Sequence, residues 1–157
     1  MASKIKIPYT VEPWFYDDEL PQAQKKLEAA GLADLWVPVG AKKNQLQIDV
    51  DHKSAKVRLP SNFKGMMGIL QQRFSLQKPL PFMATKSKGQ GTHIVINLPI
   101  EIDDVERIAW QAAFGSDGKR EALNLLRVRR NIKNPILLFM PKEDIVSVGN
   151  TARRIKE

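Results

Sequence analysis

Apolar and polar residues alternate along residues 45–51, a pattern that predicts a β-strand with one buried face. Successive side chains of a strand point to opposite faces, so the apolar residues share one face while Asp49 and Asp51 share the other. At roughly 3.3 Å of rise per residue, the two carboxylates would lie about 7 Å apart. The pair therefore indicates either a bound cation or simply the wet side of an antiparallel strand.

Two further apolar runs, at residues 81–87 and 92–100, are joined by the turn sequence KGQG and predict a β-hairpin. Strands are also expected at 32–40 and 134–140, with a short one at 56–59. The last strand contains ILLF, which is apolar on both faces, so its outer side needs a cover. The N-terminal segment and a second subunit, in a homodimer, are the two candidates.

Apolar residues spaced three and four positions apart predict helices at 20–31, 62–74, 102–114 and 119–130. The residues expected to face the core from the third helix are Val105, Ile108, Ala109 and Ala112. Those expected to do so from the fourth are Ala122, Leu123 and Leu126. The opposite side of the fourth helix would then be a basic, solvent-facing surface formed by Arg120, Arg127 and Arg130.

The order of these elements predicts an α+β fold. From Gln45 to Met140 it is β–α–β–β–α–α–β, which without the extra helix is the ferredoxin-like or RRM-like order: an antiparallel sheet with helices on one face. The chain would form one domain, with an N-terminal extension at 1–44, the RRM-like core at 45–140 and a basic C-terminal tail at 141–157. In this order the first and third strands are the adjacent, central pair.

The polar faces of those two strands would meet on the side of the sheet that no helix covers. Asp49 and Asp51 would then lie beside His93 and Asn97. A lone histidine is usually structural. A histidine facing two carboxylates, beside a basic and glycine-rich turn, is a candidate functional group.

Composition narrows the class of protein. The chain has 157 residues, enough for one domain with a core, and no apolar run approaches the ~18 residues needed to cross a membrane. The start of the sequence has no apolar segment of the kind that directs secretion. Zero cysteine excludes a disulfide framework, a thiolate zinc site and a cysteine nucleophile. A cytoplasmic protein without a membrane partner is expected.

The charge balance points to a polyanionic partner. Lys and Arg total 25 against 17 acids, for a formal net charge of +8, which favours DNA or RNA. The bases gather in ATKSKGQGTH, in GKREALNLLRVRRNIK and in the tail TARRIKE. The candidate phosphate-binding residues are Lys86, Lys88, Arg120, Arg127 and Arg130.

Two short motifs occupy the paired strands: IDVD at residues 48–51, and GTH at 91–93 directly after KSKGQ. In their order and strand placement they resemble the signature of the archaeo-eukaryotic primase and primase-polymerase superfamily, which has an RRM-like core. The resemblance is to a short or divergent member. It implies that Asp49 and Asp51 hold Mg²⁺ or Mn²⁺, that His93 contacts the phosphates of an incoming nucleotide, and that these three residues are catalytic. The implied chemistry is two-metal in-line displacement.

Three functions stay open. The first is metal-dependent nucleotidyl transfer on a DNA or RNA template, as in a minimal primase-polymerase. The second is non-catalytic nucleic-acid binding on an RRM-like fold, and the third is a metal-dependent nuclease. The family's third acid has no clear equivalent, because the strand NPILLFM contains none. Asp117, Glu121 and Asp144 are the remaining candidates.

Overall fold

The computed structural model describes residues 16–87 and 89–142, and the predicted α+β fold is confirmed. Its elements, in chain order, are α1 (Glu19–Ala29), β1 (Trp36–Gly40), β2 (Gln45–Val50), α2 (Phe63–Arg73), β3 (Phe82–Lys86), β4 (Thr92–Asn97), α3 (Asp104–Ala113), α4 (Gly118–Arg129) and β5 (Leu137–Pro141). From β2 onward this is the predicted order. The predicted strand at 56–59 is wrong, since this fully described segment is a loop, and a helix in the tail would lie outside the described residues.

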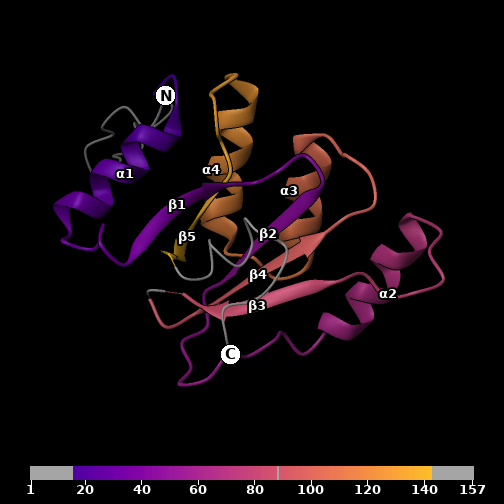
Figure 1. Ribbon diagram of the computed structural model, residues 1–157. Helices are drawn as coiled ribbons and strands as arrows, with labels where there is room; N and C mark the ends of the chain where they lie inside the picture. The colour runs from indigo at the N-terminus through magenta and orange to yellow at the C-terminus, as the bar shows by residue number, and fades with distance from the viewer. Residues whose placement is uncertain (1–15, 88, 143–157) are drawn as a thin grey trace, which may run out of the picture.

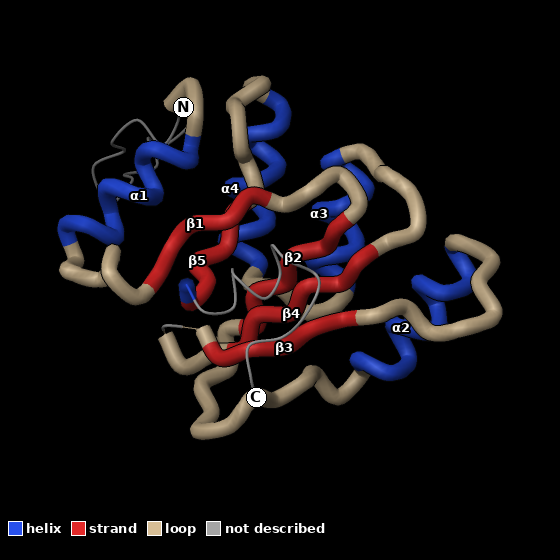
Figure 2. The backbone as a smooth tube through the Cα atoms, in the orientation of Figure 1, coloured by secondary structure: helices blue, strands red, loops and turns tan. Residues whose placement is uncertain are grey.

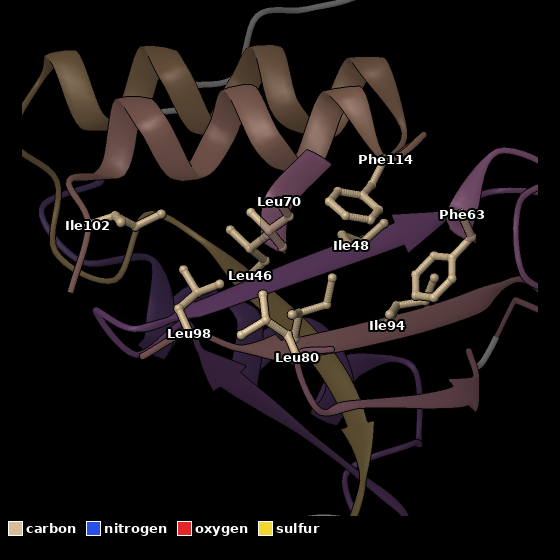
Figure 3. Close-up of a cluster of buried hydrophobic side chains, with 10 residues drawn as sticks. Leu46, Ile48, Phe63, Leu70, Leu80, Ile94, Leu98, Ile102 and Phe114 are labelled. Atoms are coloured by element: carbon tan, nitrogen blue, oxygen red, sulfur yellow. The ribbon is translucent and has the colours of Figure 1, made fainter. Parts of the chain in front are cut away.

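The larger sheet is antiparallel, with the strand order β2–β4–β3, so the predicted pairing of the aspartate strand with the histidine strand is confirmed. One face of this sheet carries the main hydrophobic core. Leu46 and Ile48 of β2 are fully buried there with Ile94 of β4, against Leu70 of α2 and Phe114 at the end of α3. Figure 3 shows these side chains converging between the sheet and the helices. Burying each such side chain contributes about 1.5–3 kcal/mol.

The opposite face of the sheet is covered, and the expectation of a bare face is therefore wrong. β1 and β5 form a separate, two-stranded antiparallel sheet. Leu138 and Met140 of β5 are buried against Val95 of β4, and Val39 of β1 and Met83 of β3 pack against this cluster. In Figure 1 the small sheet lies beside β2, with α1 next to β1. β1 (Trp36–Gly40) comes from the segment that is predicted above to be an N-terminal extension.

β2 is an edge strand of its sheet and not a central one. The side chains of α3 bond to the backbone groups that point away from β4. Arg107 Nε donates to the carbonyl oxygen of Gln45 at 2.8 Å, and Gln111 Oε1 accepts from the backbone N–H of Gln47 at 2.8 Å. An uncovered strand edge exposes unpaired N–H and C=O groups. The side chains of α3 bond to these groups of β2, as the backbone of a neighbouring strand would.

The start of α4 continues the same contact along the strand. Arg120 Nη1 donates to the carbonyl oxygen of Gln47 at 2.8 Å, and Ser116 Oγ accepts from the N–H of Asp49 at 3.0 Å. The N–H of Asp117 donates to the carbonyl oxygen of Asp49 at 2.7 Å. The edge of β2 is thus bonded over three alternating residues by polar groups from α3, α4 and the turn between them.

This arrangement corrects the predicted inner faces of both helices. In α3, Ile108 is buried as predicted, but Val105, Ala109 and Ala112 are exposed because Arg107 and Gln111 face β2. In α4, the buried residues are Glu121 and Asn124, whereas Ala122 and Leu126 are exposed. Helices that pack on a strand edge must present hydrogen-bonding side chains to it, so apolar periodicity does not identify their inner faces.

Within the described ranges, no helix is both long enough and apolar enough to traverse a lipid bilayer.

Candidate functional site

Asp49 and His93 face each other across β2 and β4, and their side chains are in contact. The two residues are register partners, with 3.3 Å between His93 Nε2 and Asp49 Oδ1. Because the backbone N–H and C=O of Asp49 bond to Ser116 and Asp117, they point away from β4. The pair is therefore of the non-hydrogen-bonded type, in which opposed side chains lie closest. His93 is only 5% exposed, whereas the Asp49 side chain is 31% exposed.

The two residues before His93 lie close to the end of β2 and to the loop that follows it. A Cβ atom on Gly91 would come within 2.5 Å of the carbonyl oxygen of Val50, so a larger residue cannot occupy this position without a backbone shift. Thr92 is 1% exposed, and its Oγ1 accepts from the N–H of Arg58 at 3.1 Å. Each residue of the motif GTH thus has a local reason for its type.

A cavity of about 200 Å³ opens beside the Asp49–His93 pair. It lies between β2, β4, β5, α1 and α4, and its lining residues are Glu19, Ala23, Lys26, Asp49, His93, Arg120, Asn124, Arg127, Leu137, Leu138 and Phe139. The outer side of β5, where Leu137 and Phe139 are half-buried, lines this cavity together with residues of α1. The charged groups of the cavity are three cations, two carboxylates and the imidazole. Arg120 and Arg127 are paired with Glu121 and Glu19, whereas Lys26 has no ion pair among the described residues.

Arg120 forms part of the cavity wall, but its side chain is only 11% exposed. Besides Gln47, its Nη1 donates to the Glu121 carboxylate, and its Nη2 donates to the carbonyl oxygen of Leu137 at 3.0 Å. Burial lowers the pKa of the Arg120 guanidinium, and the nearby Glu121 carboxylate opposes that shift. Arg120 therefore links α4 to β2 and β5, and the expected solvent-facing position is wrong.

Arg127 also points inward, since its side chain is 17% exposed, and it forms an ion pair with Glu19 of α1 at 3.3 Å between Nη2 and Oε1. Three buried atoms at this cavity have no hydrogen-bond partner among the described residues: Arg127 Nε, Glu19 Oε2 and His93 Nδ1. Buried polar atoms are normally satisfied, so this grouping indicates a place where water or a ligand binds. Sequence reasoning missed Glu19, because nothing in the α1 sequence marks it as a neighbour of β2.

The structure does not bring the other predicted residues into this cavity. Asp51 follows the last residue of β2 and is exposed, so the two acids are not both in the lining. Lys86 Nζ donates to the backbone carbonyl oxygens of Ser54 and Gln90, and Arg130 is exposed at the C-terminal end of α4. Lys88 lies outside the described residues.

The candidates for a third acid have structural contacts. Asp117 is the N-cap of α4 and accepts from the N–H of Arg120. Glu121 is 3% exposed and accepts hydrogen bonds from Gln111, Ser116 and Asn124. Asp144 lies outside the described residues. The described part of the chain contains no group of three or more metal-ligating side chains.

Asp49 and Asp51, without a third acid among the described residues, do not form a metal site made of protein ligands alone. They do fit a hard cation that is shared with a substrate, because Mg²⁺ is commonly held by one or two carboxylates together with phosphate oxygens and water. Asp49 is partly exposed at the cavity and Asp51 follows two residues later in solvent. Both carboxylates are therefore accessible to an ion from solvent.

No family model, no curated protein and no solved structure matches this chain.

Proposed function

We propose that this protein performs metal-dependent nucleotidyl transfer on a DNA or RNA template, with the Asp49–His93 cavity as the reaction site. The observation that carries the proposal is the 3.3 Å contact between the two side chains at a cavity with three cationic residues in its lining. The motif resemblance gives the reaction, and the charge of +8 gives the polyanionic partner. The proposal includes a cytoplasmic location, which rests on the absence of cysteine from the composition.

His93 would bind and orient a phosphate group. Its Nε2 faces the Asp49 carboxylate, which holds the ring in place, and its Nδ1 has no partner among the described residues. Nδ1 is the ring nitrogen left for a phosphate contact, because Nε2 is in contact with Asp49. Arg127, which is paired with Glu19, adds a guanidinium to the lining of the same cavity, and guanidinium groups bind phosphate strongly.

Asp49 and Asp51 would hold Mg²⁺ or Mn²⁺ together with the phosphates of the nucleotide. A divalent ion bound there supplies activation of the attacking 3′-oxygen and charge neutralisation at the leaving pyrophosphate. The cavity of about 200 Å³ is smaller than the ~300–1,000 Å³ of typical ligand pockets, so it matches a phosphoryl group better than a whole nucleotide. The sugar and base would lie outside it.

The test is incorporation of labelled nucleotides on a primed template in the presence of Mn²⁺. We expect extension by the wild-type protein and a loss of at least 100-fold in Asp49→Asn, because that variant lacks a charged metal ligand. The matched control is Asp34→Asn, which removes an exposed carboxylate from the α1–β1 connection. Far-UV circular dichroism verifies that both variants fold. No extension by the wild type, or equal extension by Asp49→Asn, would contradict the proposal.

Non-catalytic nucleic-acid binding is the second candidate, and the burial of His93 together with the covered face of its sheet favours it. This alternative predicts salt-sensitive binding that survives Asp49→Asn, with no incorporation by any variant. Metal-dependent disappearance of the substrate without incorporation would instead identify a nuclease.

A further inference from the structure

The loop between β2 and α2 forms a second hollow, distinct from the Asp49–His93 cavity. It has a volume of about 310 Å³, and its lining residues are Val50, His52, Arg58, Leu59, Pro60 and Ser61. The volume falls at the lower end of the range of ~300–1,000 Å³ for small-molecule sites. None of its lining residues was among the functional candidates from the sequence.

After Asp51, the first residue of this loop, the charged side chains of residues 52–58 are all basic. Residues 52–58 read HKSAKVR, with Lys53, Lys56 and Arg58 all exposed and no acid among them. Within the described parts of the chain, no carboxylate forms an ion pair with any of the three. Charges that the protein does not neutralise internally are available to an external anion.

The loop is held in place by the β3–β4 hairpin, which it passes in Figure 2. The N–H of Ser54 donates to the carbonyl oxygen of Gln90 at 3.0 Å, and the N–H of Arg58 donates to Thr92 Oγ1 at 3.1 Å. These bonds use backbone groups of the loop and leave its long cationic side chains exposed. The backbone that carries Lys53, Lys56 and Arg58 is therefore held in place before a ligand binds. This lowers the conformational entropy lost on binding.

The lining of the hollow combines one guanidinium and one imidazole with apolar side chains. Arg58 Nη1 lies 3.2 Å from His52 Nε2, so the planar guanidinium and the planar imidazole are neighbours. Val50, Leu59 and Pro60 supply apolar surface within the lining. A phosphodiester matches the guanidinium, and an unstacked base matches the apolar surface and the planar side chains.

We propose that the loop at residues 50–61 binds single-stranded nucleic acid, with phosphates on Lys53, Lys56 and Arg58 and one base in the hollow. The inference rests on the nucleic-acid partner of the proposed function, and it replaces the inward-pointing arginines of α4 as the main contact surface. A duplex offers phosphates but keeps its bases stacked, so it leaves the apolar surface unmatched. The loop begins at the end of β2, so a bound strand would lie next to Asp51.

The first test measures fluorescence anisotropy of a labelled oligothymidylate in EDTA, where the result is independent of catalysis. We expect the triple variant Lys53→Gln, Lys56→Gln, Arg58→Gln to bind at least tenfold more weakly. Its salt slope should fall by about 2, at roughly 0.7 per phosphate contact on a single strand. The matched control removes three exposed lysines elsewhere, Lys25→Gln, Lys42→Gln and Lys43→Gln, and should change affinity less than twofold. Equal losses in the two triple variants would show diffuse charge attraction and overturn the proposal.

The second test separates the hollow from the charge. Leu59→Ser removes an apolar side chain that lines it, whereas Val57→Ser removes an exposed apolar side chain two residues away that does not. We expect Leu59→Ser alone to weaken single-strand binding, about threefold or more. Equal losses of single-strand affinity in Leu59→Ser and Val57→Ser would overturn the proposal. So would tighter binding to a duplex of the same length, or full displacement of the oligonucleotide by polyglutamate. Oligonucleotide binding by a wild-type protein that incorporates no nucleotide would leave this inference standing while the transferase proposal fails.

Discussion

At the scale of single residues, the clearest result is that Arg120 stabilises the fold. It lies on a helix with the composition of a solvated basic surface, yet its guanidinium bonds to backbone carbonyl oxygens of β2 and β5. These acceptors lie 73 and 17 residues away in the chain, and carbonyl oxygens have no residue-type signature. The inward position of Arg120 could not be predicted from the sequence for that reason. The Asp49–His93 pairing could, because strand alternation and element order are both visible in the residue pattern.

The first prediction is that Arg120→Met destabilises the protein by about 3–5 kcal/mol, because it leaves the buried Glu121 carboxylate without its cation. The matched control is Arg129→Met, which removes an exposed arginine from the same helix and should change the free energy of unfolding by less than about 0.5 kcal/mol. Urea unfolding followed by circular dichroism measures both. A loss below about 1 kcal/mol in Arg120→Met would mean that its buried hydrogen bonds contribute little.

At the scale of elements, the periodicity of the sequence predicted the order of helices and strands but not the faces of α3 and α4. Strand alternation is a strong local signal, and every strand from β2 onward was anticipated within a few residues. The inner faces of the two helices depend on what they pack against. Their neighbour is a strand edge, which selects Arg107, Gln111 and Arg120, and only the three-dimensional arrangement reveals that edge.

A second prediction concerns the ion pair that joins α2 to α3. Arg73 donates to both carboxylate oxygens of Glu106, at 2.8 and 3.1 Å, and Trp110 Nε1 donates to the same carboxylate. The hydrogen bond from Arg73, followed by that from Trp110, lowers the pKa of Glu106 below its ordinary value of 4.5. The charged form therefore stabilises the folded state above that ordinary value, and this contribution is lost as the pH falls through the lowered pKa.

Glu106→Gln should consequently lower the melting temperature at pH 7, with a difference from wild type that shrinks at pH 3. Thermal unfolding at the two pH values measures this, with the exposed Glu101→Gln as the control. A Glu106→Gln difference that is unchanged or larger at pH 3 would show that the loss comes from packing and not from the carboxylate charge.

At the scale of the whole molecule, the candidate site is a cavity and not an open sheet face, because other elements cover that face of the sheet. The small β1–β5 sheet, α1 and α4 enclose the space that the element order alone leaves open, and they leave a cavity beside Asp49 and His93. The pairing of β1 with β5 joins residues about a hundred positions apart, and long-range pairing of this kind has no local signature. The sequence thus predicted correctly that Asp49 and His93 are neighbours. The elements that surround the two residues could be identified only from the structure.

The central claim is that Asp49 and His93 form one site for a cation and a phosphate, and nuclear magnetic resonance tests it directly. The chain contains two histidines, so the imidazole resonances are few, and a His52→Gln variant assigns them. In the presence of a nucleoside triphosphate, substoichiometric Mn²⁺ should broaden the Hε1 resonance of His93, and Asp49→Asn should remove that broadening. A His93 resonance that stays sharp under these conditions, or one that broadens equally in Asp49→Asn, would contradict the account.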